Sequence, residues 1–113
     1  MKLNEFKLDS AIMRTADRKL RGYIASAAYH LMEAEEYEAD YYALHDHPYY
    51  NELSKDWPDM ARLYRSLVKA DMKAARALVG DLEDVGLLDL ADWSQIEHWL
   101  IWFGIPAEDR LDD

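Results

Sequence analysis

Apolar residues in the first part of the chain recur at steps of three and four. They are Ile12, Met13, Ala16, Leu20, Tyr23, Ile24, Ala27, Leu31, Ala34, Tyr37, Tyr41 and Leu44. Such steps place residues on one face of an α-helix. The pattern therefore predicts a long first helix, beginning near Asp9 or Ser10, either of which can cap it. The helix must end before Pro48, because the residue before a proline disfavours helical backbone. Residues 1–8 are expected to form a flexible end.

Gly22 interrupts this stripe. A glycine in a helix interior costs about 1 kcal/mol relative to alanine. It therefore indicates either a kink or a close crossing with another helix. A break near Gly22 is the alternative to one helix of roughly 50 Å, at 1.5 Å per residue.

Residues 45–56 predict a connector with one short helical turn over residues 49–53. Asp56 is expected to cap a second helix, with Pro58 in the first turn, where its missing N–H costs nothing. Gly80 or Gly86 is expected to end this helix. Its apolar residues are Met60, Leu63, Tyr64, Leu67, Val68, Ala74, Ala75 and Leu78, with Leu82 and Val85 if the helix continues past Gly80.

A short third helix is predicted to begin at Asp92 or Ser94, since residues 94–97 read Ser-Gln-Ile-Glu and match a capping box. Gly104 fits the position just after its end, with Pro106 beyond. Residues 107–113 are expected to fray. The inward face is predicted to carry Ile96, Trp99, Leu100 and Phe103, which leaves Trp102 as the exposed indole and a candidate for self-association.

These elements predict an all-α fold: a small helical bundle in which a long antiparallel helical hairpin is closed by a short, Trp-rich third helix. The 113 residues are expected to form a single helical domain, 1–113. No run of residues shows the period of two that is typical of β-strands.

Charge is arranged in blocks along the chain. Residues 1–32 carry a net +3, residues 33–59 a net −8, residues 60–79 a net +4 and residues 80–113 a net −9, which gives the formal −10. Segregated charge creates a directional field. A strongly acidic chain is repelled by nucleic acid and by anionic lipid, so the expected partner is a basic protein surface. The sequence leaves open whether the basic stretches 14–21 and 62–76 pair internally or form a separate patch.

Residue types and motifs argue against several functions. The absence of cysteine excludes disulfides, thiol catalysis and cysteine-based zinc sites. No phosphate-binding loop and no nucleophile elbow occurs. His30, His45 and His47, with Glu33 and Asp40, are the candidate metal ligands, but the Glu-x-x-His motif of helical di-iron proteins is missing. We expect no catalytic residue, no metal, no cofactor and no enzymatic activity. The longest apolar run, residues 99–103, is too short for a bilayer, and a cytoplasmic location is expected.

Eight tyrosines and four tryptophans are a second unusual feature. Tyr37 and Tyr41 fall on the core stripe, but three other tyrosines in the −8 block are harder to bury together. Tyrosine is enriched at protein interfaces, because it combines apolar area with one hydrogen bond. Glu33, Glu36 and Asp40 share a helical face at about 5–6 Å spacing, near the scale of phosphates along a DNA strand. The predicted partner-binding residues are Glu33, Glu35, Glu36, Glu38, Asp40, Tyr42, Asp46, Tyr49 and Tyr50.

In size, acidity and aromatic-rich helical composition, the chain resembles small acidic inhibitors made by phages and mobile elements, the DNA-mimic anti-restriction proteins and anti-CRISPR proteins. Residues 33–42, Glu-Ala-Glu-Glu-Tyr-Glu-Ala-Asp-Tyr-Tyr, and the acidic C-terminal third carry this resemblance. The Tyr49–Tyr50 pair in its acidic setting also resembles bacterial nuclease immunity proteins. The resemblance implies an inhibitor acting in the host cytoplasm, and it assigns no residue a role.

The leading hypothesis is a non-enzymatic protein that blocks a basic, nucleic-acid-handling partner by electrostatic steering and tyrosine docking. The first alternative is a structural helical module or homo-oligomer from a phage or plasmid, associating through Trp99, Trp102 and Phe103. A metal protein or enzyme built from the histidines and carboxylates is the third hypothesis.

Overall fold

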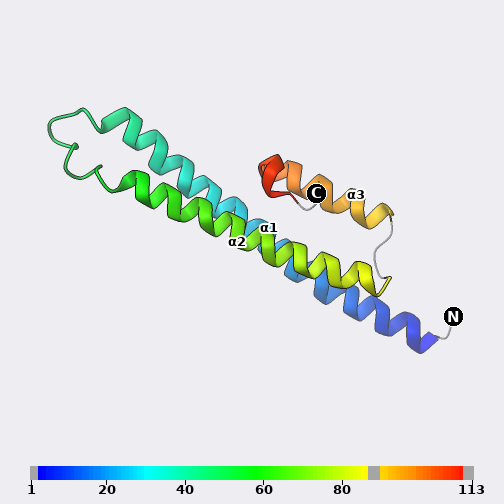
Figure 1. The fold of residues 1–113 in the computed structure, drawn as a ribbon. Helices are drawn as coiled ribbons and strands as arrows, with labels where there is room; N and C mark the ends of the chain where they lie inside the picture. Colours follow the sequence, from blue (N-terminus) through cyan, green and yellow to red (C-terminus); the bar gives the residue numbers. More distant parts are fainter. Residues whose placement is uncertain (1–2, 87–89, 111–113) are drawn as a thin grey trace.

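Helix α1 spans Leu3–Leu44 and forms the long element of the molecule (Figure 1). The structure is a computed structural model that describes residues 3–86 and 90–110, with side chains for 14–86 and 93–110. The helix begins at Leu3, not near Asp9 or Ser10, so residues 3–8 are helical where a flexible end was expected. The predicted stripe is confirmed from Ala16 onward, while the side chains of Ile12 and Met13 lie outside the described residues.

Gly22 neither breaks α1 nor marks a helix crossing. The helix continues through it, and no atom lies within 4 Å of the place where a Cβ would stand. The residue is exposed on the outer side of α1. Both expectations for Gly22 were therefore wrong, because neighbouring core residues hold the helix together across a single weak position.

Helix α2 spans Trp57–Asp84 and runs back along α1 (Figure 1). Asp56 is the residue before the helix, as predicted, with Pro58 in the first turn, although the Asp56 side chain makes no capping hydrogen bond. Gly86, with φ of +73°, follows the end of the helix, so Gly86 and not Gly80 is the stop signal. Residues 45–56 form consecutive hydrogen-bonded turns. The helical turn expected over residues 49–53 corresponds to a single i→i−4 bond from the Ser54 N–H to the Tyr50 carbonyl, and no helix is assigned there.

The two helices pack along a seam with a seven-residue repeat. On α1 the buried residues are Ala16, Leu20, Ile24, Ala27, Leu31 and Ala34, and on α2 they are Ala61, Val68, Met72, Ala75, Val79 and Leu82. Alternating steps of three and four give the knobs-into-holes packing of coiled coils. Ala61, Met72 and Val79 were missed from the sequence. Leu63 and Val85, which were predicted to be inward, are exposed because they lie off this seam.

Helix α3 spans Leu90–Trp102, so Asp92 and Ser94 lie inside the helix and the predicted capping box does not start it. Ile96 and Leu100 enter the core and Trp99 packs against it, but Phe103 is exposed, contrary to expectation. The helix ends in a Schellman motif. The Ile105 N–H donates to the Leu100 carbonyl and the Gly104 N–H to the Ile101 carbonyl, both at 3.0 Å, with Gly104 at φ of +71°.

The segment after α3 is docked, not frayed. Ile105 is fully buried in the core, and residues Ala107–Asp109 form a short 3₁₀ turn, η1. The Arg110 Nε donates to the Ile105 carbonyl at 3.0 Å, and the Arg76 guanidinium donates to the Arg110 carbonyl at 2.9 Å. Residues 107–110 therefore contradict the expected flexible tail, while 111–113 lie outside the described residues.

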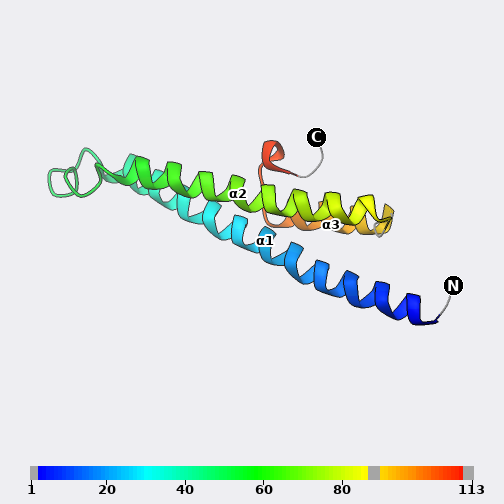
Figure 2. The same cartoon turned by 60° about the horizontal axis from the view of Figure 1, so that its bottom comes forward.

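The resulting shape is a rod of 70 × 20 × 18 Å with a radius of gyration of 18.8 Å. A compact chain of this length would have about 13 Å. The N-terminal end of α1 extends past the end of α2 and diverges from it (Figure 2), and α3 lies beside the half of the hairpin away from its loop (Figure 1). The loop between α1 and α2 therefore forms one end of the rod, well separated from α3.

Candidate functional site

The loop at the end of the hairpin is held by short-range hydrogen bonds. The Ser54 N–H donates to the Tyr50 carbonyl at 2.8 Å, and the buried Ser54 hydroxyl donates to the Asn51 carbonyl at 3.3 Å. At the other side of the loop, His45 Nδ1 lies 2.7 Å from the Tyr41 carbonyl. These bonds satisfy backbone groups that leave the two helices, so the loop presents its side chains from a defined backbone.

Aromatic side chains gather at this end. Tyr42 is 76% exposed and Tyr49 is 71% exposed, while Tyr50 is half-buried. The rings of Tyr49 and Tyr50 meet edge to face with centroids 5.0 Å apart, and the Tyr41 ring stacks on His45 at 4.6 Å. Exposed tyrosines supported by half-buried ones form a stiff apolar surface with hydroxyl groups at its edge.

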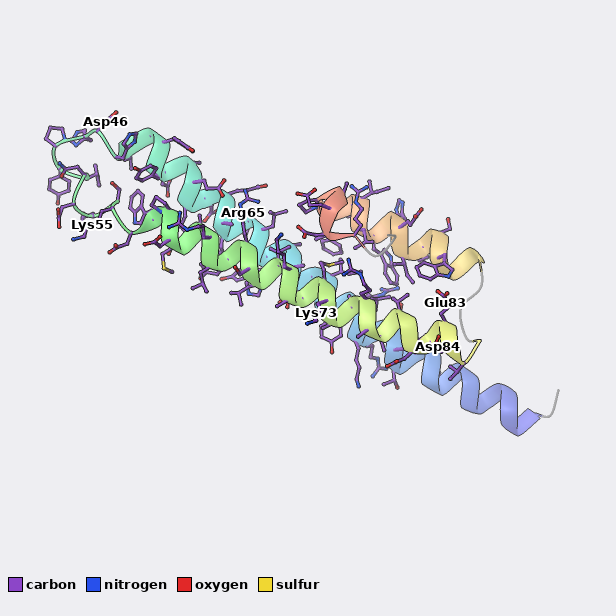
Figure 3. All side chains as sticks on the ribbon, in the orientation of Figure 1. Asp46, Lys55, Arg65, Lys73, Glu83 and Asp84 are labelled. Carbon is purple, nitrogen blue, oxygen red and sulfur yellow. The ribbon has the colours of Figure 1, made fainter. Side chains whose placement is uncertain are left out.

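Carboxylates precede these rings along the last third of α1, and one more lies in the loop. Glu35, Glu36 and Asp40 are exposed on α1, Glu33 is half-buried, and the Asp46 side chain in the loop is 93% exposed (Figure 3). Burial raises the pKa of Tyr64, and the Glu33 carboxylate nearby raises it further. We call the group Glu33, Glu35, Glu36, Asp40, Tyr42, Asp46, Tyr49 and Tyr50 the acidic tip.

Lys55 and Arg62, which lie near the acidic tip, form ion pairs with acidic residues outside it. Lys55 bonds Glu52 at 2.7 Å, and the Arg62 guanidinium pairs with Asp59 one helical turn earlier. In the part of the chain that the structure describes, no ion pair joins Glu33, Glu35, Glu36 or Asp40 to a lysine or arginine. Glu33, Glu36 and Asp40 are therefore without an ion-pair partner among the described lysines and arginines, whereas Glu35 acts on Arg65 through space and Asp46 lies 3.3 Å from His45 Nε2.

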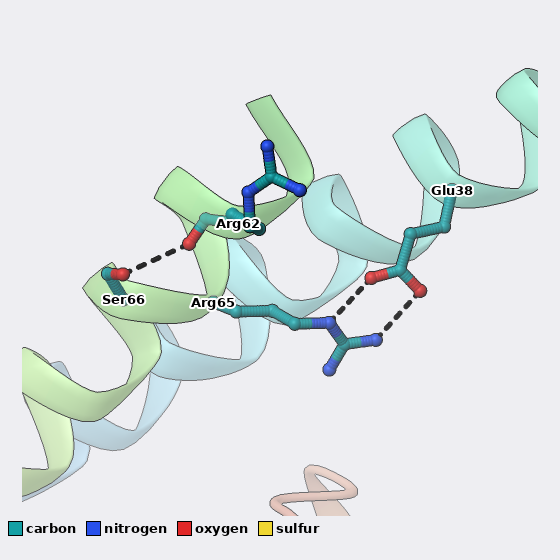
Figure 4. A network of polar contacts seen from close by, with 4 residues as sticks. All are labelled: Glu38, Arg62, Arg65 and Ser66. Atoms are coloured by element: carbon teal, nitrogen blue, oxygen red, sulfur yellow. Dashed lines mark hydrogen bonds and ion pairs between the residues drawn. The ribbon is translucent and has the colours of Figure 1, made fainter. Parts of the chain in front are cut away.

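Glu38 differs from its predicted neighbours. Its two carboxylate oxygens accept hydrogen bonds from Arg65 Nε at 2.6 Å and Nη2 at 2.9 Å (Figure 4). These bonds lower the pKa of Glu38 below its usual value and raise the pKa of Arg65. Because this carboxylate is engaged within the chain, Glu38 is not part of the acidic tip as we define it.

The histidines that suggested a metal site do not come together. His30 Nδ1 lies 2.7 Å from an Asp71 oxygen, across the hairpin, in a half-buried contact beside the Tyr64 ring. His47 Nδ1 accepts the Tyr49 N–H at 3.1 Å within the loop. Over residues 14–86 and 93–110, no group of three or more histidine or acidic side chains converges closely enough to hold a metal ion.

Several arginines of the basic stretches make contacts within the chain. Arg65 forms an ion pair with Glu38, and Arg21 forms one with Asp17 at 3.2 Å. Arg76 donates a hydrogen bond to the Arg110 carbonyl. The Arg21 guanidinium also lies over the Trp99 ring, 4.4 Å from its centroid. This contact and the His30–Asp71 pair were missed from the sequence, because each joins residues of different helices.

Within the described residues, no helix is long and apolar enough to cross a membrane. Comparisons of the chain with protein-family models, with curated proteins and with solved structures found no match.

Proposed function

We propose that this chain is a non-enzymatic binding protein whose acidic tip docks on the basic surface of a nucleic-acid-handling protein and blocks it. The observation that carries the proposal is that exposed tyrosines and carboxylates without a lysine or arginine ion pair lie together on the last third of α1 and the loop that ends a 70 Å rod. An inhibitor of the anti-defence type made by phages, such as an anti-CRISPR or anti-restriction protein, is the finer class that we propose.

Electrostatics supports a basic partner. A partner that binds nucleic acid presents lysine and arginine side chains to phosphate groups. Glu33, Glu36 and Asp40 follow one another at steps of three and four along α1, and the rigid helix fixes their spacing. Docking would pair these carboxylates with cations that otherwise contact phosphates. Long-range attraction would speed the encounter, and salt would weaken it.

The tyrosines would supply the short-range part of the affinity. Tyr42 projects from the last turn of α1, and Tyr49 from the hydrogen-bonded loop, so neither side chain needs much ordering of its backbone on binding. Pre-organised aromatic anchors lower the entropic cost of association. The narrow end of a rod also reaches into a groove that a spherical domain of equal mass would not enter.

Affinity capture from a bacterial lysate tests the proposal, provided that the captured protein is then purified. The proposal predicts a partner with a basic surface, binding that weakens as salt rises, and displacement of this chain by DNA or RNA. A partner that binds equally well with its nucleic acid site filled would contradict the blocking mechanism. Capture that tolerates Tyr42→Ala and Tyr49→Ala together would contradict docking through the acidic tip.

A further inference from the structure

We propose that the cleft between α1 and α3 is a self-association site, in which Trp102 of one copy enters the cleft of a second copy and stacks on its Arg21. The second copy does the same in return. This inference concerns a cleft between the middle of α1 and the C-terminal part of α3, outside the acidic tip, so it stands independently of the proposed function.

The cleft has a volume of about 480 Å³ and opens to solvent beside the exposed end of α3. Aromatic rings and an alanine provide its apolar area, and three polar side chains stand at its edge. Its lining residues are Arg21, Ala25, Gln95, His98, Trp99, Trp102 and Phe103. None of these is acidic, although the chain carries a net charge of −10. The lining of the cleft itself therefore brings no carboxylates of two copies face to face.

The Arg21 guanidinium can stack on a second aromatic ring. One face of its guanidinium covers Trp99 at 4.4 Å, and the bond from Nε to Asp17 fixes the plane of the group. The Arg21 side chain is nonetheless 61% exposed, so the face turned away from Trp99 is open to solvent. Guanidinium groups stack on indole rings through cation–π attraction, which strengthens when water is excluded.

The ring that fits is present on the same patch. Trp102 is 65% exposed at the rim of the cleft, next to exposed Ile101 and Phe103. A large apolar ring left in water beside an apolar cleft indicates an interaction surface. Tryptophan and arginine are also the residue types most often found at the energetic centre of interfaces.

The arrangement on α3 is self-complementary. Gln95, His98 and Trp102 follow at i, i+3 and i+7, on one stripe of the helix. A two-fold axis crossing the middle of this stripe places two α3 helices antiparallel. Trp102 then lies opposite Gln95 of the second copy, inside its cleft. Trp102 and the cleft belong to the same surface of each copy. Two copies related by a two-fold axis therefore satisfy both contacts at once, which gives a dimer and not a filament.

Sedimentation equilibrium of the full chain at several salt concentrations tests the inference. We expect a monomer–dimer equilibrium that tightens as salt rises from about 0.1 M to about 1 M, because screening reduces repulsion between two acidic chains. Trp102→Ala should raise the dimer Kd by roughly 30-fold or more, and Arg21→Gln should also raise it. Tyr42→Ala, which removes an exposed ring at the acidic tip, is the matched control and should leave the dimer Kd unchanged.

Three results would overturn the inference: a monomer at every concentration, a dimer that survives Trp102→Ala, or a dimer that weakens as salt rises. Thermal melting of each variant in dilute solution separates loss of association from loss of folding. Partner capture with the same variants distinguishes the two proposals, because Trp102→Ala should affect the dimer alone and Tyr42→Ala the partner alone.

Discussion

Glu38 and Arg65 form a two-point ion pair on the seam of the hairpin (Figure 4). Glu38 lies seven residues after Leu31, and Arg65 lies seven residues before Met72, so both occupy positions that the repeat elsewhere fills with apolar residues. Side-chain exposures of 36% for Glu38 and 43% for Arg65 keep the charges partly solvated. A charged pair on an otherwise apolar seam specifies how two helices align, at little gain in stability.

We predict a small coupling energy and a clear effect on alignment. A double-mutant cycle with Glu38→Gln and Arg65→Gln should give about 0.5–1 kcal/mol, since solvent screens the pair. Sliding α2 by one heptad would leave both charges unpaired on the seam. Spin-label distances between α1 and α2 should therefore broaden in the single variants. A coupling energy of zero, together with unchanged distances between the spin labels, would show that the Glu38–Arg65 pair does not set the alignment of α1 and α2.

The pH dependence of stability follows from the lowered pKa of Glu38, whose main cause is the hydrogen bonding from Arg65. A carboxyl with a lower pKa in the folded state contributes fully above its ordinary value of 4.5, and the contribution disappears as pH falls through the folded pKa. The difference in unfolding free energy between the parent and Glu38→Gln should thus be constant near neutral pH and should shrink below pH 4.5. A difference that grows on acidification would contradict this assignment.

Replacing Gly104 and Gly22 by alanine should change the free energy of unfolding in opposite directions. Gly104 holds a φ of +71° in the Schellman motif, so Gly104→Ala should cost about 1–2 kcal/mol through backbone strain. Gly22 lies in a continuous helix with open space around it, so Gly22→Ala should stabilise the chain by up to about 1 kcal/mol. Urea denaturation measures both, and destabilisation by Gly22→Ala would mean that α1 does need a break there.

Neighbouring residues on α3 should differ strongly in their effect on stability. Leu100 is fully buried against the hairpin, so Leu100→Ala should cost about 2–5 kcal/mol. Ile101 is exposed, and Ile101→Ala should change the unfolding free energy by no more than about 0.5 kcal/mol in dilute solution. Similar losses for the two variants would show that α3 packs in another orientation.

The sequence was sufficient for the helices and for most of the core, because the seam depends on local periodicity. Prediction from the sequence was wrong where one sequence pattern is compatible with two structures. Ser94 and Glu97 match a capping box, but α3 starts earlier, since the same residues are also acceptable within a helix. Phe103 continues the inward spacing of α3, yet the chain turns at Gly104 and buries Ile105 instead.

The candidate site could be predicted in part, where it depends on local periodicity. Tyr42, Asp46 and Tyr49 are exposed, and their exposure follows from helix periodicity and from their place in a loop. That Glu38 would turn inward to Arg65 could not be read from local spacing, because it depends on the alignment of two helices across 27 residues of sequence. The cleft between α1 and α3 is likewise made only by tertiary packing.

Charge reversal at the acidic tip tests the central claim most directly. Changing Glu33, Glu36 and Asp40 together to Lys should lower the association rate with the purified partner by about 10-fold or more at low salt, and should flatten its salt dependence. The matched control changes Asp81, Glu83 and Asp84 to Lys at the other end of α2, with the same change in net charge. Figure 3 labels Glu83 and Asp84 there. The account predicts that this control keeps most of the parent rate. Equal rates for the parent and the tip variant, with both folded by circular dichroism, would contradict it.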